Sequence, residues 1–240
     1  MKIKMKIKSK PKRLHDTFYL KENRYKNTKE SFKYLIRILK KSTSKNSQKK
    51  LADIGCANGE LIYNIKKNFK KFEITGYDIR NDLLIKAKKN NSSDIKFKKI
   101  DIKRIYKISE KFDIVVCSGV LSSIDEIEKT LSNLIKMTKK GGKIFIFEAF
   151  NPYPYNVFTK YINLEKPNIF QYGGNIFSIK YLKDFFHKRG LSTKFLKFQI
   201  KSKIPQRKDK LRAWTFGNKN KLIMNGLCFV QHQYWLIAKK

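Results

Sequence analysis

Short apolar runs alternate with amphipathic stretches through the middle of the chain. The run FDIVVC is apolar on both faces, as is typical of a central parallel strand. The predicted strands are Leu51–Ile54, Phe72–Tyr77, Ile95–Ile100, Phe112–Cys117 and Lys143–Phe147. The predicted helices start at Gly59, span Asp82–Lys89, and carry an apolar stripe from Ile124 to Ile135 that ends at Gly141-Gly142. Strands alternating with helices predict an α/β fold with a doubly wound sheet and helices on both faces.

The segments on either side of this pattern predict a two-part organisation. Residues 1–49 read as a basic arm, a helical lid within 14–41 that Thr28 can cap, and a polar linker from 42 to 49. Residues 50–240 form the main domain. After the fifth strand it continues with an aromatic insertion (149–177), a helix capped by Ser178, a strand over Leu191–Ile200, a basic loop (201–221) and a last strand within Leu227–Ala238.

The loop after the first predicted strand carries the most specific motif in the chain. It reads Asp53-x-Gly55-x-Ala57-x-Gly59, with small residues at alternate positions. Glycines let the backbone turn sharply and let a ligand approach closely. A dinucleotide would place its pyrophosphate over this loop, where the Asp53 carboxylate would oppose it. A ligand with an ammonium and a sulfonium group would instead be favoured. The motif therefore points to S-adenosylmethionine rather than NAD.

This motif resembles that of the class I S-adenosylmethionine-dependent methyltransferases, with Ala57 where a middle glycine is commonest. The resemblance implies a Rossmann-like sheet of seven strands, mostly parallel with an antiparallel last strand, and S-adenosylmethionine as cofactor. It also implies that Asp78, after the second strand, accepts the ribose hydroxyls. Asp101 would accept from the adenine amino group, with the Ile102 N–H near the ring. The residues expected to bind the cofactor are Asp53, Gly55, Cys56, Ala57, Gly59, Asp78, Ile79, Asp101, Ile102, Cys117 and Ser118.

The string Asn151-Pro-Tyr-Pro-Tyr155 resembles the Asn-Pro-Pro-Tyr motif of enzymes that methylate base amino groups. In those enzymes the motif follows the fourth strand. Here Cys117–Ser123 takes that place, and the string follows the fifth strand. We therefore interpret it as the start of the aromatic insertion, whose rings either line an acceptor pocket or pack over the sheet.

The net charge of +37 is large, yet only 8 of the 56 basic residues are Arg. Lys has AT-rich codons, so compositional drift explains much of the excess. A preference for anionic partners ranks second. Readers of nucleic-acid bases tend to use Arg, which is scarce here.

The cysteines Cys56, Cys117 and Cys228 are far apart and odd in number, which predicts neither a disulfide framework nor a metal site. We also expect no membrane span, because no long uncharged apolar segment occurs. The basic start lacks an apolar region after it, so a secretory signal is not expected. A reducing cytoplasm is the simplest setting.

No catalytic base can be named from the sequence. His187 lies near a predicted helix C-terminus, His232 in the last strand and His15 in the arm. Two functions remain in competition. The first is methyl transfer to a small-molecule or sugar-like glycan acceptor, including an anionic one. The second is methylation of rRNA or tRNA, which the basic arm and the loop 201–221 with its Trp214 and Phe216 would suit. A non-catalytic binding protein is disfavoured, since Asp53 and Asp78 are intact.

Overall fold

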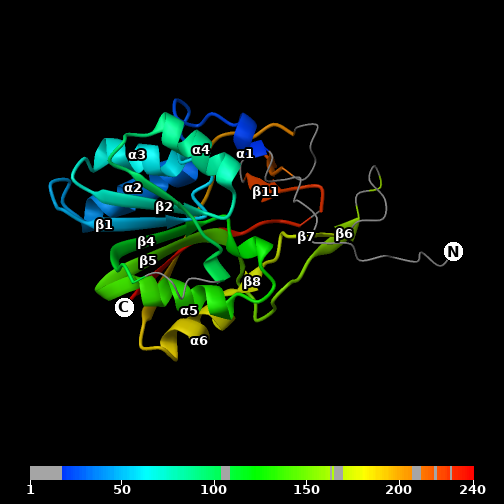
Figure 1. Ribbon diagram of the computed structural model, residues 1–240. Coiled ribbons are helices and arrows are strands. Elements are labelled where there is room, and N and C mark those ends of the chain that lie inside the picture. The colour runs from blue at the N-terminus through cyan, green and yellow to red at the C-terminus, as the bar shows by residue number, and fades with distance from the viewer. Residues whose placement is uncertain are drawn as a thin grey trace.

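A computed structural model describes residues 18–103, 109–162, 164, 170–206, 212–218, 221–227 and 229–240. Its main sheet has the strand order β3-β2-β1-β4-β5-β12-β9 (Figure 1). β12 is antiparallel to both neighbours, and β1 to β5 are parallel, which confirms the predicted fold. The strands are β1 (Lys50–Ile54), β2 (Glu73–Asp78), β3 (Lys96–Lys99), β4 (Phe112–Ser118), β5 (Thr138–Asn151), β9 (Ser192–Lys197) and β12 (Gln233–Lys239). The short strand β8 (Phe177–Ser178) pairs with the end of β5.

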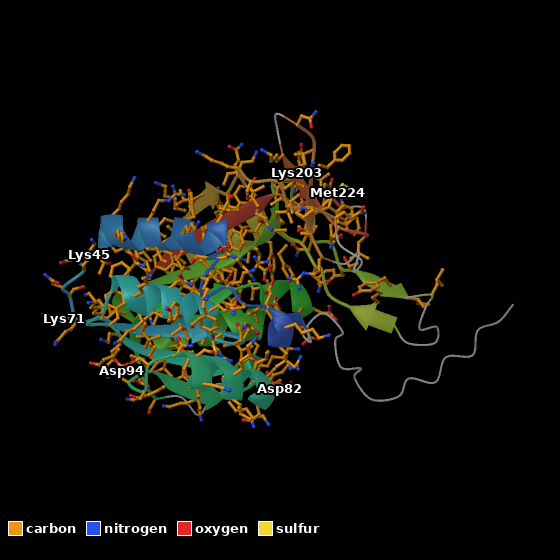
Figure 2. All side chains as sticks on the ribbon, turned by 90° about the horizontal axis from the view of Figure 1, so that it is seen from above. Lys45, Lys71, Asp82, Asp94, Lys203 and Met224 are labelled. Atoms are coloured by element: carbon orange, nitrogen blue, oxygen red, sulfur yellow. The ribbon has the colours of Figure 1, made fainter. Side chains whose placement is uncertain are left out.

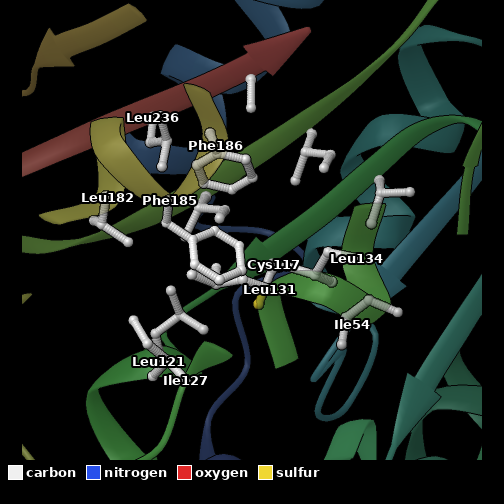
Figure 3. Packing of buried hydrophobic residues seen from close by; sticks show 14 of the residues in the cluster. Ile54, Cys117, Leu121, Ile127, Leu131, Leu134, Leu182, Phe185, Phe186 and Leu236 are labelled. Atoms are coloured by element: carbon white, nitrogen blue, oxygen red, sulfur yellow. The ribbon is translucent and has the colours of Figure 1, made fainter. Parts of the chain in front are cut away.

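Two hydrophobic clusters lie on opposite faces of this sheet. One contains apolar residues of α2 (Glu30–Ser42), α3 (Glu60–Asn68) and α4 (Asn81–Asn90). The other contains residues of α5 (Glu128–Met137) and α6 (Ile179–His187). Figure 3 shows the second cluster, in which Phe185 and Phe186 of α6 face Cys117 of β4 and Leu131 of α5. Burial of both faces explains why the central strands are apolar throughout.

Two predicted helix boundaries were wrong. The stripe ending at Gly141-Gly142 was expected to be helical, but α5 ends at Met137 and β5 begins at Thr138. Both glycines lie inside β5 at an irregular register, where Phe112 faces Thr138 but Ile114 faces Lys143. Gly141 has a φ of +76°, a conformation that glycine adopts without strain.

Thr28 does not cap a helix. Its Oγ1 donates to Asn64 Oδ1 at 2.6 Å, and Lys29 occupies the N-cap position of α2 without a side-chain cap. The helix α2 therefore depends on burial of Phe32, Leu35, Ile36 and Leu39, which sequence periodicity did predict. Ser178 does cap α6, because its hydroxyl accepts from the Tyr181 N–H.

Two small hairpins extend from the carboxyl ends of the parallel strands. Within the aromatic insertion, β6 (Lys160–Ile162) pairs with β7 (Phe170–Tyr172). The segment expected as a basic loop contains β10 (Trp214–Phe216), which pairs with β11 (Leu222–Met224). Both hairpins project from the same end of the molecule (Figure 1). Sequence pattern alone missed them because each strand is only three residues long.

Within the described residues, no helix combines the length and the apolar composition needed to cross a membrane.

Candidate functional site

A cavity of about 520 Å³ opens at the carboxyl ends of β1, β2 and β4. Nine of the eleven residues expected to bind the cofactor line it: Asp53, Gly55, Cys56, Ala57, Asp78, Ile79, Asp101, Ile102 and Ser118. They come from four separate segments of the chain. Their convergence follows from the parallel order of the strands, which brings all these loops to one edge of the sheet.

The loop after β1 folds back against the end of β2. The N–H groups of Gly55 and Cys56 both donate to the carbonyl of Tyr77, at 2.7 and 3.0 Å. Gly55 has a φ of +72°, and a Cβ at this position would collide with the side chain of Val120. Glycine is therefore required here both for the conformation of the backbone and for the close approach of the loop after β4.

Ala57 lines the cavity as expected, whereas Gly59 does not. Ala57 has a φ of +47°, so an alanine occupies a left-handed conformation that costs about 1–2 kcal/mol in an L-residue. The substitution of the usual glycine preserves the loop but introduces strain. Gly59 does not line the cavity. It is the N-cap residue of α3, and a Cβ there would lie 2.6 Å from Asn91 Nδ2.

Two backbone amides orient the carboxylate of Asp78. Its Oδ2 accepts from the Ala57 N–H and its Oδ1 from the Arg80 N–H, both at 2.9 Å. The side chain is buried at the end of β2 and also lines the cavity. A carboxylate oxygen can accept more than one hydrogen bond, so each can also receive one from a ligand.

Asp53 is almost completely buried at the base of the cavity. Burial, together with the nearby charge of Asp78, raises the pKa of Asp53 to about 7. Desolvation disfavours the charged form, and a like charge adds to this effect. A cation entering the cavity would act in the opposite direction and favour the ionised carboxylate.

The segments after β3 and β4 complete the floor. Asp101 Oδ1 accepts from the Lys103 N–H at 2.9 Å, and Asn133 of α5 donates to the Ile102 carbonyl at 2.8 Å. Ser118 lines the cavity, whereas Cys117 does not. Side chains alternate along a strand, so the Cys117 thiol faces the core cluster shown in Figure 3. Burial there raises its pKa well above the usual range, which suits an inert thiol.

The N-terminal segment covers one side of the cavity. The sequence predicted a lid here but did not indicate which of its residues reach the cavity. Tyr19 and Lys29 line the cavity. Asn58 Nδ2 donates to the Tyr19 carbonyl at 3.0 Å, and Lys86 Nζ donates to the Leu20 carbonyl at 2.7 Å. These partners are 39 and 66 residues apart in the chain, and no local pattern signals such contacts.

Glu22 joins this cover to the C-terminal part of the chain. Its carboxylate pairs with Lys29 and Arg24, each at 3.2 Å, and with Arg212. Burial alone would raise the pKa of Glu22, but the charges of Lys29, Arg212 and Arg24 outweigh it and lower the pKa to about 2. The cluster therefore stays ionised at neutral pH.

A second contact joins the same parts of the chain. Glu30 in the first turn of α2 accepts from the backbone N–H groups of Lys201 and Ser202, at 3.0 and 3.1 Å.

Residues of the aromatic insertion form hydrogen bonds to the loop after β4, which lines the opposite side of the cavity. The Ser122 carbonyl accepts from the N–H groups of Gly174 and Asn175 at 2.9 and 3.0 Å. The buried Asn175 side chain donates to the Ile124 carbonyl and to Asp125. This network holds the loop whose Val120, Ser123 and Ile124 line the cavity. The described residues of the insertion do not themselves line it.

The NPYPY string has an independent local role. Asn151 ends β5, its Oδ1 accepts from the Tyr153 N–H, and its Nδ2 donates to the Tyr155 carbonyl. The amide is thus occupied within its own turn, which agrees with the rejection of the base-amine motif.

His187 is the last residue of α6 and His232 precedes β12; neither lines the cavity. His15 and Cys228 lie outside the described residues. Within the described parts of the chain, no group of three or more His, Cys, Asp or Glu is arranged to hold a metal ion.

Comparisons with known proteins identify the family of the chain. A family model described as a methyltransferase domain matches residues 45–168. Malonyl-[acyl-carrier protein] O-methyltransferase of Bacillus cereus is 25% identical over 130 residues, which cover 53% of this chain and 48% of that protein. Ubiquinone biosynthesis O-methyltransferase of Coxiella burnetii is 28% identical over 115 residues, covering 45% and 48%. The chain thus spans about half the length of the curated relatives it matches.

The structure of magnesium protoporphyrin IX methyltransferase from Synechocystis with bound S-adenosylhomocysteine has a TM-score of 0.55 to this one. The match is 13% identical and covers 88% of this chain and 82% of that chain, and it shows a shared fold. Because the family model matches more than half of the chain and the fold agrees, the chain belongs to the class I S-adenosylmethionine-dependent methyltransferase superfamily.

Proposed function

We propose that this protein transfers a methyl group from S-adenosylmethionine to a small-molecule acceptor, with the cavity at the ends of β1, β2 and β4 as the cofactor site. The observation that carries the proposal is the convergence of Asp53, Asp78 and Asp101 around the loop Gly55–Gly59 in one cavity. Each carboxylate has a matching group on the cofactor: a positive charge, a pair of ribose hydroxyls and an adenine amino group.

Asp78 accepts the two ribose hydroxyls in this proposal. The Ala57 and Arg80 amides hold its carboxylate before any ligand arrives, so little ordering is left to the moment of binding. Asp101 accepts from the adenine amino group, and the apolar side chains of Ile79 and Ile102 flank the ring. Ile79 is exposed beside the cavity, a position that a bound adenine would cover.

Asp53 supplies the electrostatic preference for this cofactor. A buried carboxyl with a raised pKa gains most from a ligand that brings a positive charge. S-adenosylmethionine carries both a sulfonium and an ammonium group, whereas a dinucleotide brings phosphates. Gly55, Cys56 and Ala57 then provide backbone that approaches the ligand closely, and Ser118 borders the place of methyl transfer.

The acceptor reaches the methyl group between the N-terminal cover and the loop after β4. Residues 18–49 act as the lid on one side, and Val120, Ser123 and Ile124 form the other side. A cavity closed in this way suits a small acceptor better than a folded RNA. The names of the relatives, which are O-methyltransferases for malonyl-acyl-carrier protein and in ubiquinone biosynthesis, support an acceptor of modest size. A sugar-like or anionic acceptor would fit the basic lining residue Lys103.

Methyl transfer itself requires mainly alignment of the acceptor with the activated methyl group. The cofactor supplies the leaving group, and the chain holds both partners in line while excluding water.

The acceptor class is tested by incubating the protein with S-adenosylmethionine labelled with tritium in its methyl group. A small-molecule extract and total RNA are offered side by side at physiological salt. We expect label in the small-molecule fraction. Robust label in one discrete RNA species would contradict the proposed acceptor, and no label in either fraction would contradict methyl transfer. The Asp78→Asn variant serves as the low-affinity control.

Replacing Asp78 with Asn should weaken binding of S-adenosylhomocysteine by about 10- to 100-fold, since the amide keeps one acceptor oxygen and loses one hydrogen bond to a charged group, worth about 1.5–3 kcal/mol. Titration calorimetry measures this directly. Glu73→Gln, an exposed change at the other end of β2, is the matched control and should leave affinity unchanged. NADH should not bind the wild type measurably. Equal affinity in wild type and a folded Asp78→Asn variant would rule out the ribose role.

The raised pKa of Asp53 predicts a specific pH dependence. Below about pH 7 the carboxyl is protonated in the free protein, so binding of the cationic cofactor must release a proton. Affinity for S-adenosylmethionine should therefore rise with pH up to about pH 7, by at most about ten-fold per unit, and then level off. The Asp53→Asn variant should bind weakly with a flatter profile.

The same group affects stability with the opposite sign. Its folded pKa is raised above the unfolded value of 3.8, so the free protein should lose stability as pH rises from about 4 to 7. Asp53→Asn should therefore raise the melting temperature at pH 8. A steep pH profile that survives in Asp53→Asn would show that another group titrates.

A further inference from the structure

Large apolar side chains are exposed mainly at one edge of the molecule. Among the described residues, the exposed large apolar side chains other than Ile85 all belong to segments at the carboxyl ends of the parallel strands. We call this set the apolar rim. It consists of Leu20, Ile79, Tyr153, Tyr155, Phe158, Leu164, Phe216, Leu222, Phe229 and Val230.

The segments of the rim are neighbours in space as well as at the same edge. The Phe150 N–H donates to the His232 carbonyl at 2.9 Å, which joins the start of the insertion to the C-terminal segment. A Cβ at Gly174 would lie 3.4 Å from Leu227, which joins the end of the insertion to the segment after β11. Figure 1 shows β6, β7 and β11 on the same side of the molecule.

The exposure of these side chains has no explanation in the packing of the domain. Tyr155 is 68% exposed and Phe216 is 64% exposed, although the sheet buries both of its faces elsewhere. Scattered single apolar residues are ordinary on protein surfaces, but a group gathered around one opening marks an interaction site. The rim reaches the cavity at Ile79, which is exposed and also lines the cavity.

Basic residues predominate on the two longest segments of the rim. Residues 151–178 and 198–232 contain ten Lys or Arg and two acids, Glu165 and Asp209. Lys160, Lys201, Lys203 and Lys221 are among the described residues, whereas Arg212 is paired with Glu22. Lys201 and Lys203 are exposed. We propose that the apolar rim docks on the surface of an anionic phospholipid bilayer, so that the cavity opens toward the membrane.

The chemistry of the rim matches such a surface. Aromatic rings and aliphatic side chains enter the boundary between head groups and acyl chains, while lysines are attracted to anionic lipids. Single-stranded RNA would also attract lysines and would stack on rings. It offers little to Leu222 and Val230, because aliphatic side chains do not stack on bases as aromatic rings do. The mixture of aliphatic with aromatic residues therefore favours a bilayer. This inference concerns binding and does not require the proposed methyl transfer.

The test is cosedimentation of the full-length protein with vesicles at physiological salt. We expect binding to vesicles of phosphatidylglycerol and little binding to vesicles of phosphatidylcholine. Phe216→Ser should lower partitioning by about five-fold, because a ring that enters the bilayer is lost. Ile85→Ser is the matched control: Ile85 is 62% exposed in the middle of α4, and its replacement should have little effect.

Two double variants with the same loss of charge distinguish binding through the rim from binding through the net charge of the protein. Lys201→Gln with Lys203→Gln should weaken binding by about 30-fold, because each lysine near an anionic surface contributes about 1 kcal/mol. Lys45→Gln with Lys71→Gln removes the same charge from two exposed positions that lie together elsewhere on the molecule (Figure 2). This pair should have little effect. Affinity for S-adenosylhomocysteine and the melting temperature show that each variant is folded.

Two outcomes would overturn the inference. Equal weakening by both lysine pairs, with no effect of Phe216→Ser, would mean that net charge alone causes binding. Tighter binding to a single-stranded RNA oligonucleotide than to phosphatidylglycerol, lost in Phe216→Ser, would assign the rim to nucleic acid.

Discussion

The burial of the Asp53 carboxyl beside the charge of Asp78 is the constraint on which the site depends. Asp53 lies in β1, which pairs with the strand that ends at Asp78, and burial with the charge of Asp78 raises the pKa of Asp53 to about 7. An Asn in place of Asp53 would not carry the cost of burying a carboxyl group beside another carboxylate. Instead the Ala57 and Arg80 amides fix Asp78 in place, and the loop of Gly55 and Ala57 bends tightly around it at the cost of a left-handed alanine. Such an arrangement becomes favourable when a cationic ligand with hydroxyl donors enters.

In the N-terminal cover of the cavity, the pKa of a buried carboxyl is lowered and not raised. Glu22 is also buried, but three basic side chains surround it and its pKa falls to about 2. The carboxylate thereby joins the N-terminal segment to Arg212 near the other end of the chain. Breaking a buried pair of this kind costs more than an exposed one, because a charge is left without compensation. The N-terminal cover is therefore held by paired charge, whereas Asp53 at the base of the cavity lies beside a like charge.

Sequence reasoning located the elements whose pattern is local. The apolar runs predicted the five parallel strands, and the position of each loop at a strand end predicted which side chains meet in the cavity. It failed where the answer depends on distant or short contacts. Cys117 was included because it ends a strand, but side-chain alternation turns it into the core and leaves Ser118 at the cavity. Gly59 was assigned to the ligand, yet it is needed for packing against Asn91. Tyr19 and Lys29 reach the cavity through contacts across many residues, and three-residue strands leave no periodic signal.

The central claim is that S-adenosylmethionine occupies the cavity with its ribose on Asp78 and its positive charge near Asp53. The most direct test is a crystal structure of the protein with S-adenosylhomocysteine bound. The account predicts both ribose hydroxyls within hydrogen-bond distance of the Asp78 carboxylate, the adenine between Ile79 and Ile102 with its amino group on Asp101, and the amino-acid end beside Gly55. A ligand bound elsewhere, or one whose ribose does not touch Asp78, would contradict it.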